Sequence, residues 1–217
     1  MDLVRQDTLK AYQEIKQKIT TLQLDPGEPV DEDTLSAELD LGPTAIREAL
    51  KLLAHDGLIV VTPRHGIRVA EANPADLSQL FEMRLPLETL CARMAAERAT
   101  EDDISVMEAL VREATLAQAE RDLDRLLDLD HRYHRALANA SHNQYMLKTL
   151  ESFFGLSERL WYLALPEVDW LIVALERHAE MVDAIKARNG DRAAALMGEH
   201  VLDFQKQVER ALGLDAG

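Results

Sequence analysis

Four ionisable side chains stand at positions where apolar residues are expected to face a helical core. Asp130 and His134 occur in the segment DHRYH, and the leucines on either side of it recur at helical spacing. His178 and His200 interrupt two further apolar stripes closer to the end of the chain. Buried ionisable groups are tolerated when they are paired, hydrogen-bonded or bound to a metal. The four residues therefore require partners, either separate ones or a common one.

The spacing of these residues predicts that they converge. Asp130 and His134 are four residues apart, so they lie on the same face of one helix. His178 and His200 lie at nearly equal distances on either side of a turn that includes Asn189. In an antiparallel helical hairpin they would face each other, with a mismatch in height of about 1.5 Å. All four side chains are thus expected to meet inside one helical bundle.

Three imidazoles and one carboxylate form a donor set that suits a borderline divalent ion, with Zn²⁺ foremost and Ni²⁺, Fe²⁺ and Mn²⁺ as alternatives. The competing interpretation is a set of core histidines, or a His–Asp hydrogen bond, without any ion. That interpretation holds for most single histidines, but four aligned residues favour a metal. The predicted metal ligands are Asp130, His134, His178 and His200, and no catalytic residue is predicted.

The elements that must position these residues give a mainly α chain. Beyond residue 72, amphipathic patterns follow one another with short breaks, which is typical of an antiparallel helical bundle. The expected helices cover residues 75–99, 101–121, 123–141, 143–163, 167–188 and 191–212. We therefore expect two domains, residues 1–72 and residues 73–217, with the candidate metal site in the second.

The first 72 residues carry a different pattern. A helix is expected over residues 8–22, a second begins after Asp31, and a third begins at Pro43 and ends at Gly57. The segments LIVVT and IRVA indicate two short strands that form a hairpin. This order is the N-terminal winged helix-turn-helix layout, in which the β-hairpin is the wing. A small α+β interaction domain without a DNA role is the alternative.

Several separated motifs support DNA binding. The chain contains a PGE turn, REAL in the expected recognition helix, GLI before the wing and a glycine at the wing tip. In this order, over about residues 8–70, they resemble the DNA-binding domain of the GntR family of bacterial transcription regulators. One departure is that Gly42 and Pro43 replace the usual Ser-Arg pair. The chain thus lacks an arginine that could contact guanine, and the operator sequence cannot be inferred.

The resemblance implies operator DNA as a partner. Candidate DNA-binding residues in the recognition helix and wing are Thr44, Arg47, Lys51, Arg64, His65 and Arg68. Residues 1–72 contain eight Lys and Arg against thirteen Asp and Glu, a balance of −5. Because four of the eight basic residues fall in this helix and wing, we expect a local basic strip. Its affinity for DNA should depend on dimerisation and fall steeply with salt.

Residues 75 to 212 resemble the FCD ligand-binding domain of the FadR-type branch of the same family. The metal-binding subset of that domain has an Asp-x-x-x-His motif followed by two further histidines, which match the four candidate ligands. In this subset the metal implies recognition of a small organic acid whose carboxylate completes the coordination sphere. The resemblance therefore implies a homodimeric transcriptional regulator, a repressor in most relatives, that a small carboxylate effector controls.

Arg84 and Asn143 are candidate contacts for that effector. Arg84 shares the apolar stripe of its helix and has Glu88 four residues on, so a structural ion pair is the alternative. Asn143 follows a helix break, where a cap or turn role is the alternative. A metalloenzyme or a direct metal sensor would use the same Asp/His site, but no general base stands out, so no enzyme is expected.

Composition limits the remaining classes. The net charge of −15 argues against a chain that simply coats nucleic acid. No apolar run is long enough to span a membrane, and the start MDLVRQDTLK is too polar for a signal peptide. The single cysteine, Cys91, fits a reducing compartment. We therefore expect a cytoplasmic protein without membrane contact.

Overall fold

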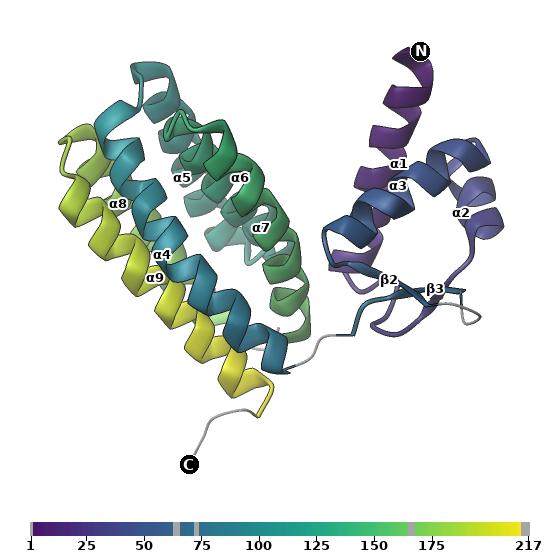
Figure 1. Ribbon diagram of the computed structural model, residues 1–217. Coiled ribbons are helices and arrows are strands. Elements are labelled where there is room, and N and C mark those ends of the chain that lie inside the picture. Colours follow the sequence, from purple (N-terminus) through teal and green to yellow (C-terminus); the bar gives the residue numbers. More distant parts are fainter. Residues whose placement is uncertain (1, 63–65, 72–73, 165–167, 214–217) are drawn as a thin grey trace. The chain divides into compact units, whose positions relative to one another are not determined.

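The computed structural model describes residues 2–62, 66–71, 74–164 and 168–213. Within this part, the side chains of residues 2–4, 74–77, 123, 161, 163–164 and 168–175 are not described. The described residues form nine helices and three strands (Figure 1). They divide into two compact units, residues 1–73 with 155–163 and residues 74–154 with 164–217. None of the described helices combines the length and apolar character needed to cross a membrane.

The first unit has the winged helix-turn-helix layout that the sequence predicts. Its helices and strands are α1 (Asp2–Thr20), β1 (Pro29–Val30), α2 (Glu32–Leu39), α3 (Pro43–His55), β2 (Ile59–Thr62) and β3 (Gly66–Val69). The start of α2 is fixed locally, because the side chain of Asp31 caps the helix by accepting a hydrogen bond from the backbone N–H of Thr34 at 2.8 Å. Pro43 is the first residue of α3, as expected from its fixed φ and missing N–H.

The sheet of this unit differs from the expected hairpin in one respect. Strands β2 and β3 pair antiparallel, from Ile59 opposite Val69 to Thr62 opposite Gly66. A third strand, β1, pairs with the other edge of β3, giving the order β1-β3-β2. Helix α1 also begins six residues earlier than expected, at Asp2. The wing hairpin, β2 and β3, thus belongs to a small three-stranded sheet in which β3 is the central strand.

Apolar side chains of the helices and strands form the core of the first unit. Ile15 and Ile19 of α1, together with Ile46 and Leu53 of α3, are completely buried. They pack in the same cluster as Leu58, which precedes β2. Burying each such side chain contributes about 1.5–3 kcal/mol, so this core fixes α3 against α1. The opposite face of α3 is exposed and carries three of the candidate DNA contacts, Thr44, Arg47 and Lys51.

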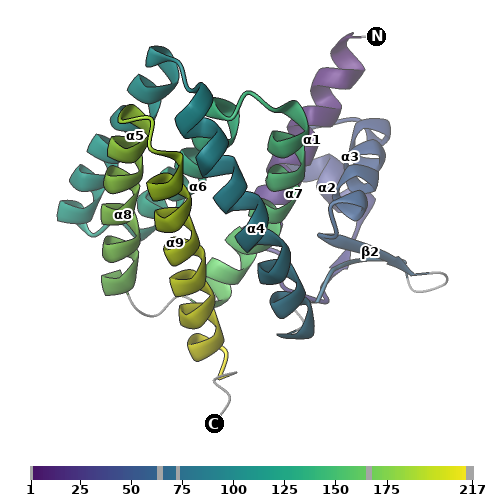
Figure 2. The ribbon, with the colours of Figure 1, turned by 60° about the vertical axis from the view of Figure 1, so that its left-hand side comes forward.

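Helices alone build the second unit. They are α4 (Pro74–Arg98), α5 (Glu101–Glu120), α6 (Leu123–Ala140), α7 (Gln144–Ala164), α8 (Val168–Lys186) and α9 (Gly190–Ala211). Residues 155–163 of α7, however, are grouped with the first unit. Helices α4 and α9 lie side by side (Figures 1 and 2), and α6 packs against α4, α5 and α8. Gly198 permits the close approach of α4 and α9, because a Cβ there would lie 3.3 Å from Cγ2 of Thr89.

Caps and turns fix the register of the helices that carry the candidate ligands. Asp122 caps α6 by accepting a hydrogen bond from the backbone of Arg125 at 3.1 Å. Between α8 and α9, Arg188 adopts a left-handed φ of 56°, and Asn189 caps α9 through the backbone of Arg192 at 3.0 Å. This tight connection makes α8 and α9 an antiparallel hairpin. Residues equally far from the turn therefore lie at the same height.

Candidate metal centre

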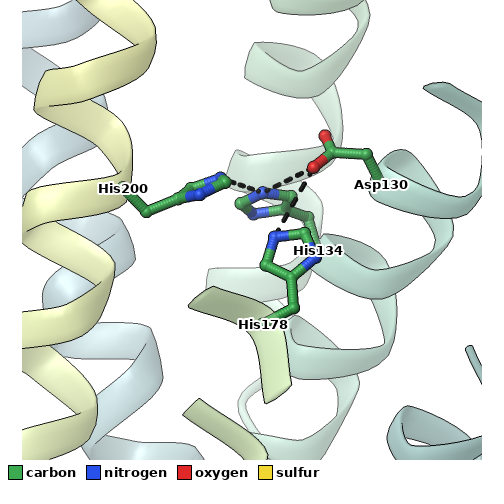
Figure 3. A group of neighbouring side chains, drawn as sticks. All are labelled: Asp130, His134, His178 and His200. Carbon is green, nitrogen blue, oxygen red and sulfur yellow. Dashed lines mark hydrogen bonds and ion pairs between the residues drawn. The ribbon is translucent and has the colours of Figure 1, made fainter. Parts of the chain in front are cut away.

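The four predicted ligands come together inside the second unit (Figure 3). Asp130 and His134 project from α6, His178 from α8 and His200 from α9. Each residue is at most 5% exposed. In the part of the chain that the structure describes, no other group of three or more His, Cys, Asp or Glu side chains is arranged to hold an ion. The predicted convergence is confirmed, and the His178 and His200 rings are 4.8 Å apart.

The distances between the candidate ligand atoms suit a single ion. One ligand atom from each residue lies within 4.8 Å of all the others. His134 Nε2 is 3.0 Å from His200 Nε2, and Asp130 Oδ1 is 3.5 Å from His178 Nε2. Atoms bonded to one ion at about 2.1 Å lie about 3.0 Å apart at right angles and about 4.2 Å apart when opposite. The cluster therefore needs only a small contraction to surround a divalent cation.

Unpartnered polar atoms supply an independent test of fit. Asp130 Oδ1, His178 Nε2 and His200 Nδ1 are buried and have no hydrogen-bond partner among the described residues. The separations of 3.5 Å and 3.8 Å between Asp130 Oδ1 and the two nearest histidine nitrogens are too long for hydrogen bonds. A buried polar atom without a partner costs about 1–3 kcal/mol. A cation bound to Asp130 Oδ1 and His178 Nε2 would relieve that cost, so these residues fit a metal ion.

The electrostatics of the cluster also favour metal binding. Burial lowers the pKa of His178 and His200 well below the usual histidine value, and the charge of His134 lowers both further. Both rings are therefore neutral at pH 7 and have a lone pair to offer. Burial raises the pKa of Asp130, against the lowering effect of His134. A bound cation would act in the opposite direction and hold Asp130 as a carboxylate.

Tyr133 fixes the orientation of His178. Its ring stacks on the imidazole at a centroid distance of 3.9 Å and an interplanar angle of 10°. Its hydroxyl donates a hydrogen bond to the backbone carbonyl of His178 at 3.2 Å. Neighbouring side chains thus hold the imidazole in place before any ion binds. Such preorganisation is typical of functional sites rather than of chance polar residues.

Arg84 and Glu88 of α4 lie beside the four ligands. Arg84 Nε donates to Glu88 Oε1 at 2.5 Å, and these side chains are 3% and 1% exposed. Burial would raise the pKa of Glu88, but the charge of Arg84 and the contact with His134 lower it to about 2. The structural ion pair, which is the alternative to an effector contact for Arg84, is present, and the effector contact stays a prediction. The approach of Glu88 to His134, at 3.1 Å, is a feature that the sequence pattern did not reveal.

Asn143 caps a helix, which is the alternative to a role as an effector contact. Its side-chain oxygen accepts hydrogen bonds from the backbone N–H groups of Tyr145 and Met146 at 3.0 Å and 3.2 Å. These bonds satisfy two donors at the start of α7. The contact with an effector stays a prediction.

The candidate DNA-binding residues are separated from this cluster in the sequence and lie on the first unit. Thr44, Arg47, Lys51 and Arg68 are all exposed, whereas Arg64 and His65 lie outside the described residues. Arg47 Nε donates to Glu32 Oε2 at 3.0 Å, and Lys51 pairs with Glu48 at 2.7 Å. Arg68 donates to the carbonyl of Gly27 at 2.8 Å. Their exposure leaves them accessible to a polyanion.

Comparisons with known proteins match both units. Residues 8–69 match the family described as bacterial regulatory proteins, gntR family, and residues 79–203 match the FCD domain. The chain is 33% identical to the Nta operon transcriptional regulator of Aminobacter aminovorans, over 88% of each chain. It is 25% identical to the HTH-type transcriptional repressor RspR of Escherichia coli, over 92% of this chain and 87% of that repressor.

The solved structure of E. coli McbR/YncC has the same fold, with a TM-score of 0.83 and 20% identity over 94% of this chain and 97% of that one. The family matches and the similarity to the Nta operon regulator identify a transcriptional regulator. The chain belongs to the GntR family of bacterial regulators, and its second domain is an FCD domain.

Proposed function

We propose that this regulator binds operator DNA as a homodimeric repressor, and that a small organic acid bound at a divalent metal changes its affinity for the operator. The observation that carries the proposal is the set of four buried donor residues in the FCD domain, each of which has a ring or carboxylate atom without a hydrogen-bond partner among the described residues. The repressor role is supported by RspR, a relative that is named as a repressor.

The chain's own residues account for both halves of the proposed activity. On the first unit, exposed Arg47 and Lys51 provide positive charge on the recognition helix α3, and exposed Arg68 provides positive charge on strand β3. Gly42 offers no side-chain cap at the start of this helix, Pro43 has no N–H, and exposed Thr44 adds a hydroxyl there. Helix N-termini and hydroxyl groups hold phosphates, so these residues position the domain on the DNA backbone.

In the second unit, the donor residues determine the charge that an effector meets. A divalent ion held by these four residues would supply a Lewis-acidic centre that could bind a carboxylate. Because the three imidazoles bind as neutral ligands and Asp130 carries one negative charge, the loaded centre keeps a positive charge. Arg84 lies beside the ligands on α4, and Glu88 balances its charge, so the net positive charge of the loaded site is that of the metal centre. The site therefore attracts an organic anion.

Calorimetric titration of the zinc-loaded protein with a panel of small carboxylates tests the effector half of the proposal. We expect at least one acid to bind the loaded protein and not the zinc-stripped protein. Binding that is indifferent to zinc would exclude the proposed mode of recognition. Continuous turnover of an acid would identify a metalloenzyme, and operator binding that responds to zinc alone would identify a metal sensor.

Replacing Arg47 by alanine tests the DNA half. We expect operator affinity to fall roughly 10-fold or more, because the guanidinium reaches a phosphate or a base from the recognition helix. The fold should be unaffected, since the ion pair with Glu32 is largely exposed and contributes little to stability. The measurement is fluorescence anisotropy with operator DNA at several salt concentrations.

Arg112→Ala is the matched control, because Arg112 is an exposed arginine on α5 of the other unit. It should retain wild-type affinity and the wild-type salt dependence. Equal affinities for the Arg47 variant, the control and the wild type would remove Arg47 from the DNA interface.

A further inference from the structure

Glu88 stands between a buried arginine and a candidate metal ligand. Its Oε1 accepts a hydrogen bond from Arg84 Nε at 2.5 Å, and its Oε2 lies 3.1 Å from His134 Nδ1. All three side chains are at most 5% exposed. Helix α4 thus contributes no ligand to the cluster, but it places a carboxylate directly behind one of the ligands.

The two nitrogens of His134 face different neighbours. Nδ1 faces Glu88, whereas Nε2 faces the cluster, at 3.0 Å from His200 Nε2 and 3.8 Å from Asp130 Oδ1. A neutral imidazole carries one proton, and the nitrogen without the proton is the one that can bind a metal. A carboxylate behind Nδ1 retains the proton on that nitrogen and leaves the lone pair on Nε2.

We infer that Glu88 is a positioning residue of the metal centre, which accepts the Nδ1–H of His134 and so directs Nε2 of that ring at the ion. The inference rests on the proposed function, because it requires the four-residue cluster to bind a metal. Carboxylates in this outer position fix the tautomer and orientation of a histidine ligand and raise its basicity.

Arg84 completes the arrangement by balancing the buried charge of Glu88. A carboxylate without a countercharge would be costly at this depth. The guanidinium is itself held in place, because it lies over the rings of Phe81 and Phe204 at 5.4 Å and 5.2 Å from their centroids. Contacts therefore run from Arg84 through Glu88 to His134. They connect helix α4 to the ligands on α6.

The variant Glu88→Gln tests this role while keeping the shape of the side chain. We expect its zinc dissociation constant, measured by competition with a chromogenic chelator, to rise about 10- to 100-fold. Glu82→Gln is the matched control, because Glu82 is an exposed glutamate on the same helix. It should bind zinc as the wild type does. Because Glu88→Gln leaves Arg84 unbalanced, a second variant, Arg84→Met with Glu88→Leu, removes both charges and should weaken zinc binding at least as much.

A ¹H–¹⁵N NMR spectrum of the histidine side chains in the zinc-loaded protein supplies a second readout. This spectrum would not change if Glu88 only formed a structural ion pair with Arg84. In the wild type, His134 should be protonated at Nδ1, bound to zinc through Nε2, and show a slowly exchanging Nδ1 proton. The same proton should exchange rapidly in the double variant Arg84→Met with Glu88→Leu, in which no carboxylate accepts it. Unchanged zinc affinity and unchanged proton exchange in folded variants would overturn the inference. If the wild type itself bound no zinc, the proposed function would fail and the inference with it.

Discussion

Replacing His178 by alanine is expected to lower the affinity for zinc by at least about 100-fold. This loss should exceed the loss caused by replacing a residue that contacts only a ligand, such as Glu88. The substitution removes one of the four donors and leaves Asp130 Oδ1 without its nearest histidine, at 3.5 Å. It also removes the ring on which Tyr133 stacks. Zinc competition with a chelator measures the loss directly, and circular dichroism checks that the helices remain.

His142→Ala is the appropriate control for this variant. His142 also belongs to the second unit, but it is 48% exposed and pairs with Asp103 at 2.9 Å, outside the cluster. Its replacement should leave zinc affinity unchanged. If the His178 variant remained folded and bound zinc as tightly as the wild type, the assignment of the four ligands would be wrong.

Removing the metal is expected to destabilise the protein markedly. Binding to the folded state alone stabilises it by about 2.7 kcal/mol when the free zinc concentration is 100 times the dissociation constant. For a chain of this size, each kcal/mol corresponds to roughly 2–4 °C in the unfolding temperature, so chelation should lower the Tm by roughly 5–11 °C. The physical reason is that the buried atoms of the cluster lose their common partner.

Calorimetric scans with zinc and with chelator measure this difference. Adding zinc back should restore the Tm, and in the His178→Ala protein both scans should give nearly the same Tm. Identical scans for the wild type with and without zinc would show that the four residues form an ordinary polar core.

The fold could be predicted wherever local signals determine the structure. Asp31 and Pro43 mark the starts of α2 and α3 because capping and the fixed φ of proline act within a few residues. Strand β1 was missed because its two residues, Pro29 and Val30, have no periodicity. Their partners Arg68 and Ile67 lie far along the chain. The early start of α1, at Asp2, was missed because the first residues are too polar to show an apolar stripe.

Local patterns also predicted some residues of the candidate site and not others. The positions of Asp130 and His134 followed from helical spacing, and those of His178 and His200 followed from the symmetry of one hairpin. The role of Glu88 could not be predicted, because no local pattern reveals that α4 packs behind α6. For the same reason, the sequence indicated Arg47 as a candidate DNA contact but not its ion pair with Glu32, fifteen residues earlier.

The most direct test of the proposed regulation is the operator affinity of the zinc-loaded and zinc-stripped proteins, measured with and without the acid that binds most tightly. Coupling between effector and DNA sites typically amounts to about 1–3 kcal/mol, so the acid should shift the operator affinity of the loaded protein roughly 5- to 150-fold. It should leave the stripped protein and the His178→Ala protein unchanged. An equal shift in all three proteins, or no shift in the loaded one, would contradict control of DNA binding through a metal-bound acid.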